Sequence, residues 1–240
     1  LLVLSVVLVG CSGKTNSPVT NDEQKNSNSF LYLTQESNEN LISVEIPVIA
    51  TANSKAVNAC IKEQVYHELE HWLLLEECNL TESKMPIANI SERMASSEYS
   101  AQYLHVSSHI SLENEELVSI VFAGQHNAKS AAHPNDVFFT INVDILSAER
   151  VGVADLYTVD DALYDAFLRY ANSERIDSDK LVSLDLFEKD TFLEGLTQEP
   201  EKEFYSYFTP THTGISYPVI HALGDHIEAE IPNEWMRKAD

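Results

Sequence analysis

The chain has 240 residues, and its 44% hydrophobic and 22% charged content is that of an ordinary soluble globular protein with one generous domain or two small ones. Acidic residues outnumber basic ones by 38 to 15, which gives a formal net charge of -23 at pH 7. Nucleic acid and anionic membrane surfaces are poor partners for such a chain, whereas a basic protein or a cation would be attracted. Acidity also keeps a protein soluble, so the charge has two explanations.

The first 11 residues resemble the apolar core of a signal peptide that ends in a bacterial lipobox. The apolar run is too short to span a bilayer as a helix. Its last four residues, Leu8-Val9-Gly10-Cys11, match the lipobox, in which the cysteine thiol receives a diacylglycerol. Residues 12–29 are rich in Ser, Asn and Thr without apolar periodicity, which predicts a disordered tether. We therefore expect an extracytoplasmic lipoprotein that is attached to the bacterial membrane through Cys11.

Two cysteines remain after acylation of Cys11, and they form an even pair in an oxidising compartment. The segment between Cys60 and Cys78 has helical periodicity. A continuous helix of this length would hold the two sulfurs roughly 27 Å apart, far beyond disulfide range. A chain that folds back before Cys78 would still allow the bond. The sequence favours free thiols and leaves the disulfide open.

Residues 30–95 are predicted to form an N-terminal α/β subdomain. Strand-like segments at 30–34 and 41–48 are separated by polar residues that suit a hairpin. A helix is predicted at about 54–77, because apolar residues recur there every four positions. These apolar positions are Val57, Ile61, Val65, Leu69 and Leu73.

The predicted helix contains HELEH at residues 67–71, a literal match to the H-E-x-x-H pattern of zinc proteases. In that pattern His67 and His71 would bind zinc, and Glu68 would activate the bound water. On this helix, however, Glu68 falls inside the apolar stripe while the two histidines point away from it. No clear third ligand motif follows. We therefore interpret HELEH as part of an exposed helical face and expect no metal site.

Residues 96–240 are predicted to form a C-terminal subdomain with most of the strands. Expected strands lie at 98–112, 117–122 and 137–146, expected helices at 162–170 and 184–195, and a hairpin with a closing strand at 204–232. His105 and His109 share one face of the first strand but lie about 13 Å apart, so we interpret them as solvated. The fold class is α+β, with a mostly antiparallel sheet on which one long N-terminal helix and two C-terminal helical segments pack.

Residues 116–157 contain two strand-like runs that flank a loop at 123–136 with two histidines. A strand ending in Phe-x-Gly is followed by Ala132-His133-Pro134, then by a strand ending at Asp144, and then by Asp155-Leu156-Tyr157. This pattern resembles the extracellular domain of the anti-sigma-V factor RsiV and its lipoprotein relatives. A domain of this kind also occurs beside the catalytic domain of some peptidoglycan deacetylases.

The resemblance covers about residues 30–236. The chain departs from the family pattern at Ser147-Ala148-Glu149, where a turn glycine is usual, and at Gln125-His126-Asn127, in a loop that is often glycine-rich. These departures affect the geometry expected of the loop.

The resemblance implies a non-catalytic binding module for an envelope partner, either a basic muramidase such as lysozyme or peptidoglycan itself. In RsiV this domain receives lysozyme. The candidate binding residues surround the loop, and they are Gly124, His126, His133, Pro134, Asn135 and Asp144. We expect no cofactor and no metal.

Two alternatives stay open. In the first, the chain is an envelope hydrolase in which His126 or His133 acts as general base beside Asp136 or Asp144. The sequence contains no nucleophile elbow, phosphate loop or deacetylase metal motif to support it. In the second, the protein has a structural assembly role without a small ligand.

Overall fold

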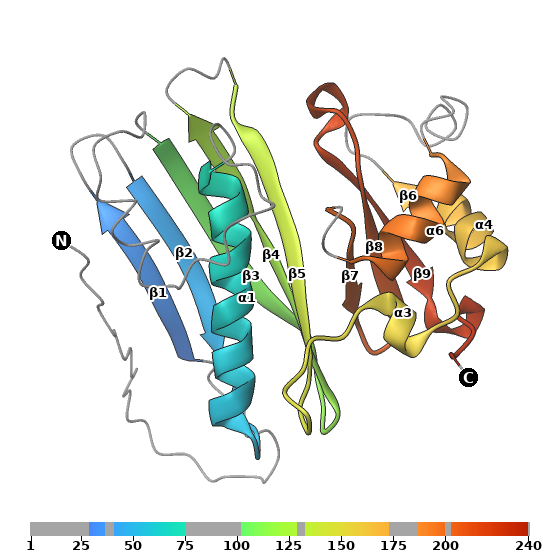
Figure 1. The fold of residues 1–240 in the computed structure, drawn as a ribbon, viewed down its shortest axis with the longest axis horizontal. Helices are drawn as coiled ribbons and strands as arrows, with labels where there is room; N and C mark the ends of the chain where they lie inside the picture. Colours follow the sequence, from blue (N-terminus) through green and yellow to red (C-terminus); the bar gives the residue numbers. More distant parts are fainter. Residues whose placement is uncertain are drawn as a thin grey trace, which may run out of the picture.

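The computed structural model describes residues 29–36, 41–74, 102–128, 133–172, 187–199 and 203–239. They form a five-stranded and a four-stranded sheet, both mostly antiparallel, with helices packed on them (Figure 1). The predicted α+β class is therefore confirmed. The predicted lipobox with Cys11, Cys78 and all of the predicted tether except its last residue, Ser29, lie outside the described residues. No helix in the described part of the chain has both the length and the apolar character needed to cross a membrane.

The first sheet has the strand order β1-β2-β3-β4-β5. Its strands are β1 Ser29–Glu36, β2 Leu41–Val48, β3 Gln102–Glu113, β4 Leu117–Ala128 and β5 Asn135–Asp144. Strands β2 and β3 pair in parallel, and all other neighbours in this sheet are antiparallel. Because β2 and β3 pair across the predicted subdomain boundary near residue 95, that boundary does not separate two sheets. The chain changes sheet between β5 and β6 instead.

Helix α1, Ser54–Leu74, covers one face of the first sheet (Figure 1). Val57, Ile61, Val65 and Leu69 are fully buried, as their spacing predicts. They pack in one core with alternate residues of the strands, among them Val44, Leu104, Phe122 and Phe139. Each such side chain contributes about 1.5–3 kcal/mol by leaving water. This apolar contact is therefore the main attachment of α1.

The HELEH segment lies on α1 as its periodicity predicts. Glu68 is only 3% exposed, and His67 is exposed. The side chain of His71 lies outside the described part of the structure. Cys60, also on α1, has a free thiol whose pKa is raised, mainly by burial and then by the charge of Glu63.

The second sheet has the order β6-β9-β8-β7. Its strands are β6 Ala171–Asn172, β7 Tyr205–Phe208, β8 His212–Pro218 and β9 His226–Pro232. The helical segments of this half are α3 Val153–Leu156, α4 Asp161–Tyr170, α6 Lys189–Thr197, η1 His221–Leu223 and η2 Asn233–Trp235. A second core joins α4 and α6 to one face of this sheet through Phe167, Phe192, Ile215, Ile227 and Ile231.

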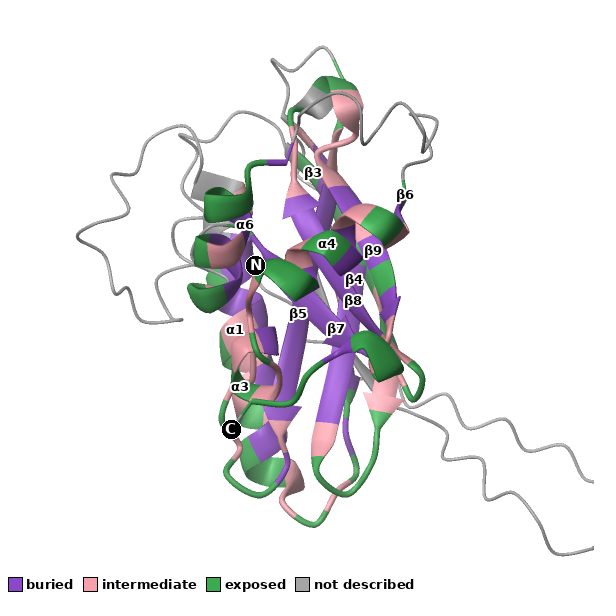
Figure 2. Cartoon of the chain, turned by 90° about the vertical axis from the view of Figure 1, so that its right-hand side faces the viewer, coloured by how far each residue is buried: buried purple, intermediate pink, exposed green. Residues whose placement is uncertain are grey.

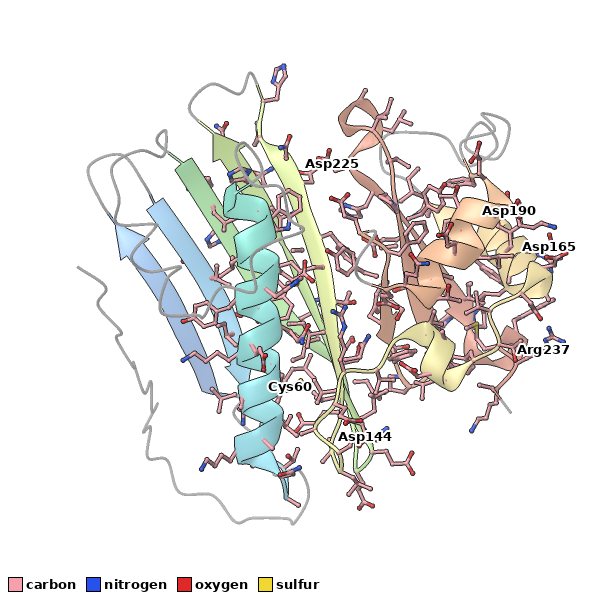
Figure 3. All side chains as sticks on the ribbon, viewed as in Figure 1. Cys60, Asp144, Asp165, Asp190, Asp225 and Arg237 are labelled. Atoms are coloured by element: carbon pink, nitrogen blue, oxygen red, sulfur yellow. The ribbon has the colours of Figure 1, made fainter. Side chains whose placement is uncertain are left out.

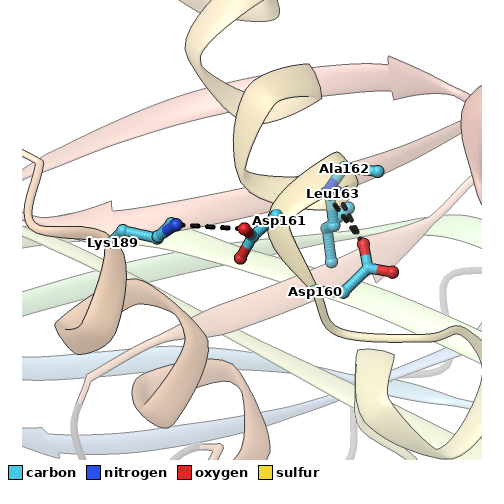
Figure 4. Close-up of polar contacts among 5 residues, drawn as sticks. All are labelled: Asp160, Asp161, Ala162, Leu163 and Lys189. Atoms are coloured by element: carbon cyan, nitrogen blue, oxygen red, sulfur yellow. Dashed lines mark hydrogen bonds and ion pairs between the residues drawn. The ribbon is translucent and has the colours of Figure 1, made fainter.

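Polar contacts at the start of α4 cap this helix and link it to α6 (Figure 4). Asp160 is the N-cap residue, and its Oδ1 accepts hydrogen bonds from the backbone N–H groups of Ala162 and Leu163 at 2.9 and 3.1 Å. These bonds satisfy donors that a helix N-terminus otherwise leaves unpaired. Lys189 Nζ lies 3.1 Å from Asp161 Oδ2 and links α6 to α4. Both partners of this ion pair are exposed, so it adds little stability.

The two sheets meet where β7 lies against β4 and β5, and Figure 2 shows β5 and β7 as neighbouring, largely buried strands. Strand β7 is the edge of its sheet, so its outward backbone groups lack strand partners. Thr140 Oγ1 and Asn142 Nδ2 donate to the carbonyl of Ser206 at 2.6 and 2.8 Å. Ser119 Oγ accepts from the N–H of Phe208 at 2.9 Å. We call these five residues the polar junction.

Glu199 completes the polar junction from the side of α6. Its Oε1 accepts from the N–H of Ser206 at 2.6 Å, and its Oε2 accepts from the N–H of Val153 at 3.3 Å. Burial raises the pKa of the Glu199 carboxyl to about 7, although the charge of Arg150 and the hydrogen bonds from Ser206 and Val153 act in the opposite direction. The residue as a whole is half-buried. A carboxyl whose pKa is raised to near neutral pH therefore contacts β7, the strand at which the two sheets meet.

Candidate functional site

The predicted loop at 123–136 is largely strand. Strand β4 continues through His126 to Ala128, and β5 begins at Asn135, opposite His126. His133 and Pro134 are exposed, and residues 129–132 lie outside the description. Polar residues near the end of a strand resemble a loop in sequence, which explains why the strand was predicted too short.

His126 is 6% exposed and packs edge-to-face on Trp72 of α1, with ring centroids 6.2 Å apart. Asp136 pairs with Gln125, the neighbour of His126, and side chains of successive strand residues point to opposite faces. His126 and Asp136 therefore lie on opposite faces of the sheet. The structure therefore does not bring together His126 and Asp136, one of the pairs that the hydrolase hypothesis offers.

Asp144 lies at the other end of β5 from His126 and His133, as its label in Figure 3 shows. Its Oδ1 accepts from the N–H groups of Leu146 and Ser147 at 2.9 and 2.7 Å and from Ser147 Oγ at 3.0 Å. The hydrogen bond from the Ser147 N–H is the largest cause of a lowered Asp144 pKa. Asp144 therefore stabilises the turn after β5, and the prediction that it neighbours the histidines is wrong.

Gly124 has a packing role in the first sheet. A Cβ built at this position would lie 1.9 Å from the carbonyl oxygen of His105 on β3, which no side chain can tolerate. His105 and His109 on that strand are exposed, as the sequence predicts. Gly124 also lines a cleft between the two sheets, and Asn135 lines a smaller hollow beside it, so two of the predicted binding residues border a candidate site.

The cleft between the two sheets has a volume of about 620 Å³, and its lining includes three carboxylates and two tyrosines. The first sheet contributes Ala123, Gly124, Asp136 and Val137. The second sheet contributes Tyr207, His226, Glu228 and Glu230. We call this space the acidic cleft. Its volume lies within the range of about 300–1,000 Å³ that is usual for ligand sites.

Tyr207 binds the carboxylates of β9 at the centre of the acidic cleft. Its hydroxyl lies 3.1 Å from Glu230 Oε1 and 3.3 Å from Glu228 Oε2. To reach them its ring crosses β8 above Gly214, where a Cβ would come within 2.1 Å of the ring. Burial, followed by the two carboxylates, raises the pKa of Tyr207 far above its ordinary value. The phenol therefore stays protonated as a hydrogen-bond donor.

A smaller hollow of about 260 Å³ adjoins the acidic cleft and shares Asp136 and His226 with it. Its aromatic lining residues are Trp72, Phe138 and Tyr205. Its other polar lining residues include Glu203, Ser216 and Asp225. We call this hollow the side pocket. Among the described residues, no lysine or arginine lines the side pocket or the acidic cleft.

Phe138 is the centre of the aromatic packing between the two hollows. Its ring lies edge-on to Tyr205 and Tyr207, each with a centroid distance of 6.4 Å, and stacks on His226 at 4.6 Å. Edge-on and offset-stacked geometries are the favourable ones for aromatic pairs. These contacts connect rings that line the side pocket with Tyr207 and His226 of the acidic cleft.

Two further hydrogen bonds connect the elements that line the acidic cleft and the side pocket. Tyr205 Oη donates to Oε2 of the buried Glu68 at 2.8 Å, which connects β7 to α1. Asp225 Oδ2 accepts from the N–H of Asp136 at 2.7 Å, which connects the start of β9 to the start of β5. Figure 3 shows Asp225 at the end of the intersheet space opposite Asp144. The cleft is therefore supported from both sheets.

The described residues contain no group of three or more His, Cys, Asp and Glu side chains that could hold a metal ion. The residues that line the acidic cleft and the side pocket offer negative charge, phenol groups and aromatic surface. Such a lining suits an organic cation, which carboxylates attract and aromatic faces accept. The lining is therefore compatible with a positively charged ligand.

Sequence reasoning did not identify this site. An alternation was visible in β9, where His226, Glu228 and Glu230 share one face and Ile227, Ala229 and Ile231 share the other. That pattern indicates a polar face on a half-buried strand. It does not show that this face lies opposite Asp136, because the two positions are about 90 residues apart in the chain.

No protein-family model matches the chain, and no curated protein matches its sequence. Among solved structures, a DUF3298 family protein from Pseudomonas aeruginosa PAO1 is similar, with a TM-score of 0.56 and 11% identity over 87% of this chain and 91% of that chain. A member of the DUF3298 family from Bacteroides fragilis NCTC 9343 has a TM-score of 0.43 and 15% identity over 87% and 91%. The first likeness shows that this chain has the fold of a DUF3298 family protein.

Proposed function

We propose that this protein is a non-catalytic binding module that receives a basic partner in the acidic cleft. The observation that carries the proposal is the lining of the cleft, to which two sheets contribute Asp136, Glu228 and Glu230 and which contains no described lysine or arginine. A cleft with one sign of charge between apolar walls concentrates its field and attracts opposite charge. The net charge of -23 acts in the same direction at longer range.

The finer proposal is that the module works at the bacterial envelope. It is supported by the predicted lipobox at Cys11 and by the RsiV-like pattern in residues 116–157. Together they favour a surface-anchored lipoprotein whose partner is a basic muramidase such as lysozyme, or peptidoglycan. A muramidase fits the charge of the cleft better than peptidoglycan does. The hydrolase alternative is weaker because His126 faces α1, Asp136 faces the second sheet, and Asp144 lies at the far end of β5.

A binding experiment with the full chain and a basic muramidase tests the proposal. We expect saturable binding at low salt that weakens strongly at about 0.5 M salt, because surface charge is then screened over a few ångströms. A double variant, Glu228→Gln with Glu230→Gln, should weaken binding at least tenfold. Absence of binding at low salt would contradict the proposed partner.

The matched control is Glu115→Gln with Glu116→Gln. These two exposed residues lie in the turn between β3 and β4, so the double variant changes the net charge equally but leaves the acidic cleft intact. We expect little change in affinity from it at moderate salt. An equal loss of binding in both double variants would show that only the overall charge matters and would remove the cleft from the proposal.

A further inference from the structure

Ser216 of β8 is a buried polar residue in the side pocket that the fold does not use. The residue is 0% exposed, and its Oγ has no hydrogen-bond partner in the described part of the structure. Its cross-strand neighbours are Tyr205 on β7 and Glu228 on β9. A buried hydroxyl without a partner is unfavourable, and proteins seldom keep one without a use for it. Since Ser216 lines the pocket, a ligand there can supply the missing hydrogen bond.

Aromatic rings form the apolar wall of the side pocket. Trp72 comes from α1, Phe138 from β5 and Tyr205 from β7, so three separate elements contribute one ring each. Aromatic faces attract organic cations, and tryptophan does so most strongly. Burial, followed by the charge of Glu68, raises the pKa of Tyr205 well above its ordinary value, so this ring stays a neutral phenol.

Carboxylates complete the pocket. Glu203 and Asp225 both have left-handed backbone conformations, with φ of 61° and 67°, which residues other than glycine seldom adopt. Asp136, whose N–H binds Asp225, supplies a third carboxyl group. The pocket thus offers aromatic faces, negative charge and one hydroxyl acceptor.

We propose that the side pocket binds a single lysine or arginine side chain and anchors the basic partner that the acidic cleft attracts. The ammonium or guanidinium group would donate to Ser216 Oγ, lie near Glu203, Asp136 or Asp225, and have its stem against Trp72 and Phe138. The volume of about 260 Å³ is below the usual range for whole small-molecule ligands, which suits one side chain. This inference deepens the proposed function and rests on it for the source of the side chain.

Trp72 provides a direct test, because the chain has only two tryptophans. Replacing the other one, the half-exposed Trp235 that stacks on Arg169, leaves Trp72 as the single indole reporter. The Trp235→Phe protein is titrated with N-acetyl-lysine methylamide and N-acetyl-arginine methylamide, and the fluorescence of Trp72 is recorded. We expect a saturable change with these cations and none with the neutral, Nε-acetylated lysine compound. An equal response to the neutral compound overturns the proposal, as does no saturable response to either cation.

Ser216→Ala in the Trp235→Phe background is the decisive variant. We expect it to weaken lysine binding about tenfold, the effect of one lost hydrogen bond to a charged group. Its unfolding midpoint should not fall, because the hydroxyl has no hydrogen-bond partner among the described residues. Ser107→Ala, on the exposed face of β3, is the control and should leave binding unchanged. Unchanged lysine binding in Ser216→Ala overturns the assignment of the pocket.

The same variants separate this inference from the proposed function. If a basic muramidase binds and depends on Glu228 and Glu230 while Ser216→Ala leaves its affinity unchanged, only the assignment of the side pocket is overturned. If the lysine compound binds at Trp72 but no basic muramidase binds the full chain, the proposed partner is wrong and the side pocket stands.

Discussion

The two faces of the first sheet are buried in different ways. Toward α1, the sheet presents apolar residues, and Phe122 and Phe139 stack with centroids 4.6 Å apart. Toward the second sheet, it presents Ser119, Thr140 and Asn142, all 0% exposed, which bind the backbone of β7. The apolar face supplies most of the stability. The polar face determines where β7 lies, because each of its hydrogen bonds needs one particular partner.

This difference determines the position of the candidate site. An apolar contact tolerates small shifts, whereas the polar junction holds Ser206 against β5 and Phe208 against β4 in one register. Tyr205 and Tyr207, which alternate with them, then point to the side pocket and the acidic cleft. The polar junction therefore positions both hollows.

The largest expected effect comes from the apolar face. Phe139→Ala removes a fully buried ring that stacks on Phe122, and it should lower the free energy of unfolding by about 3–5 kcal/mol. Urea denaturation followed by circular dichroism measures the loss. A loss below about 1 kcal/mol would mean that the apolar face is not the main source of stability.

The next effect is the pH dependence of the polar junction. The pKa of Glu199 is about 7 in the fold, above its ordinary value of 4.5, so the folded state binds this proton more tightly than the unfolded chain does. Its stabilising contribution is therefore fully present below about pH 4.5 and is lost as the pH rises through about 7. The free energy of unfolding should fall by up to about 3 kcal/mol across this range through Glu199 alone.

Glu199→Gln isolates this contribution, because glutamine does not titrate and its amide oxygen still accepts from the N–H of Ser206. Denaturation of both proteins at pH 5 and pH 8 gives the difference, in which the other titrating groups cancel. We expect the variant to be less sensitive to the rise in pH than the natural protein. Parallel pH profiles would mean that Glu199 does not titrate in this range.

A smaller effect is expected from the polar junction itself. Thr140→Val with Asn142→Leu removes both donors to the carbonyl of Ser206 and leaves that oxygen buried without them. The expected loss is about 1–3 kcal/mol, the cost of an unsatisfied buried acceptor. The emission of Trp72 should also change, because β7 carries Tyr205 into the side pocket. If the double variant had the same stability and the same Trp72 emission as the natural protein, other contacts would position β7.

The sequence predicted the apolar face better than the polar one. The four-residue period of α1 is a local pattern, and it correctly placed Glu68 in the buried stripe. It could not show why a carboxylate is buried there, because the partner Tyr205 lies 137 residues further along the chain. The position of Asp144 was predicted wrongly for the opposite reason. Asp144 is close to His133 in sequence, but it lies at the far end of the ten-residue strand β5. Sites made by contacts between distant segments leave few local traces.

The smallest expected effect concerns the part of the polar face where β3 is open to solvent. His105 and His109 point outward from this strand and are exposed, so His105→Ala and His109→Ala should each change the free energy of unfolding by less than about 0.5 kcal/mol. Denaturation of the two single variants measures this. A loss above 1 kcal/mol in either would show that this part of the face is covered in the protein. The comparison of the two faces would then have to include a second buried contact on the polar side.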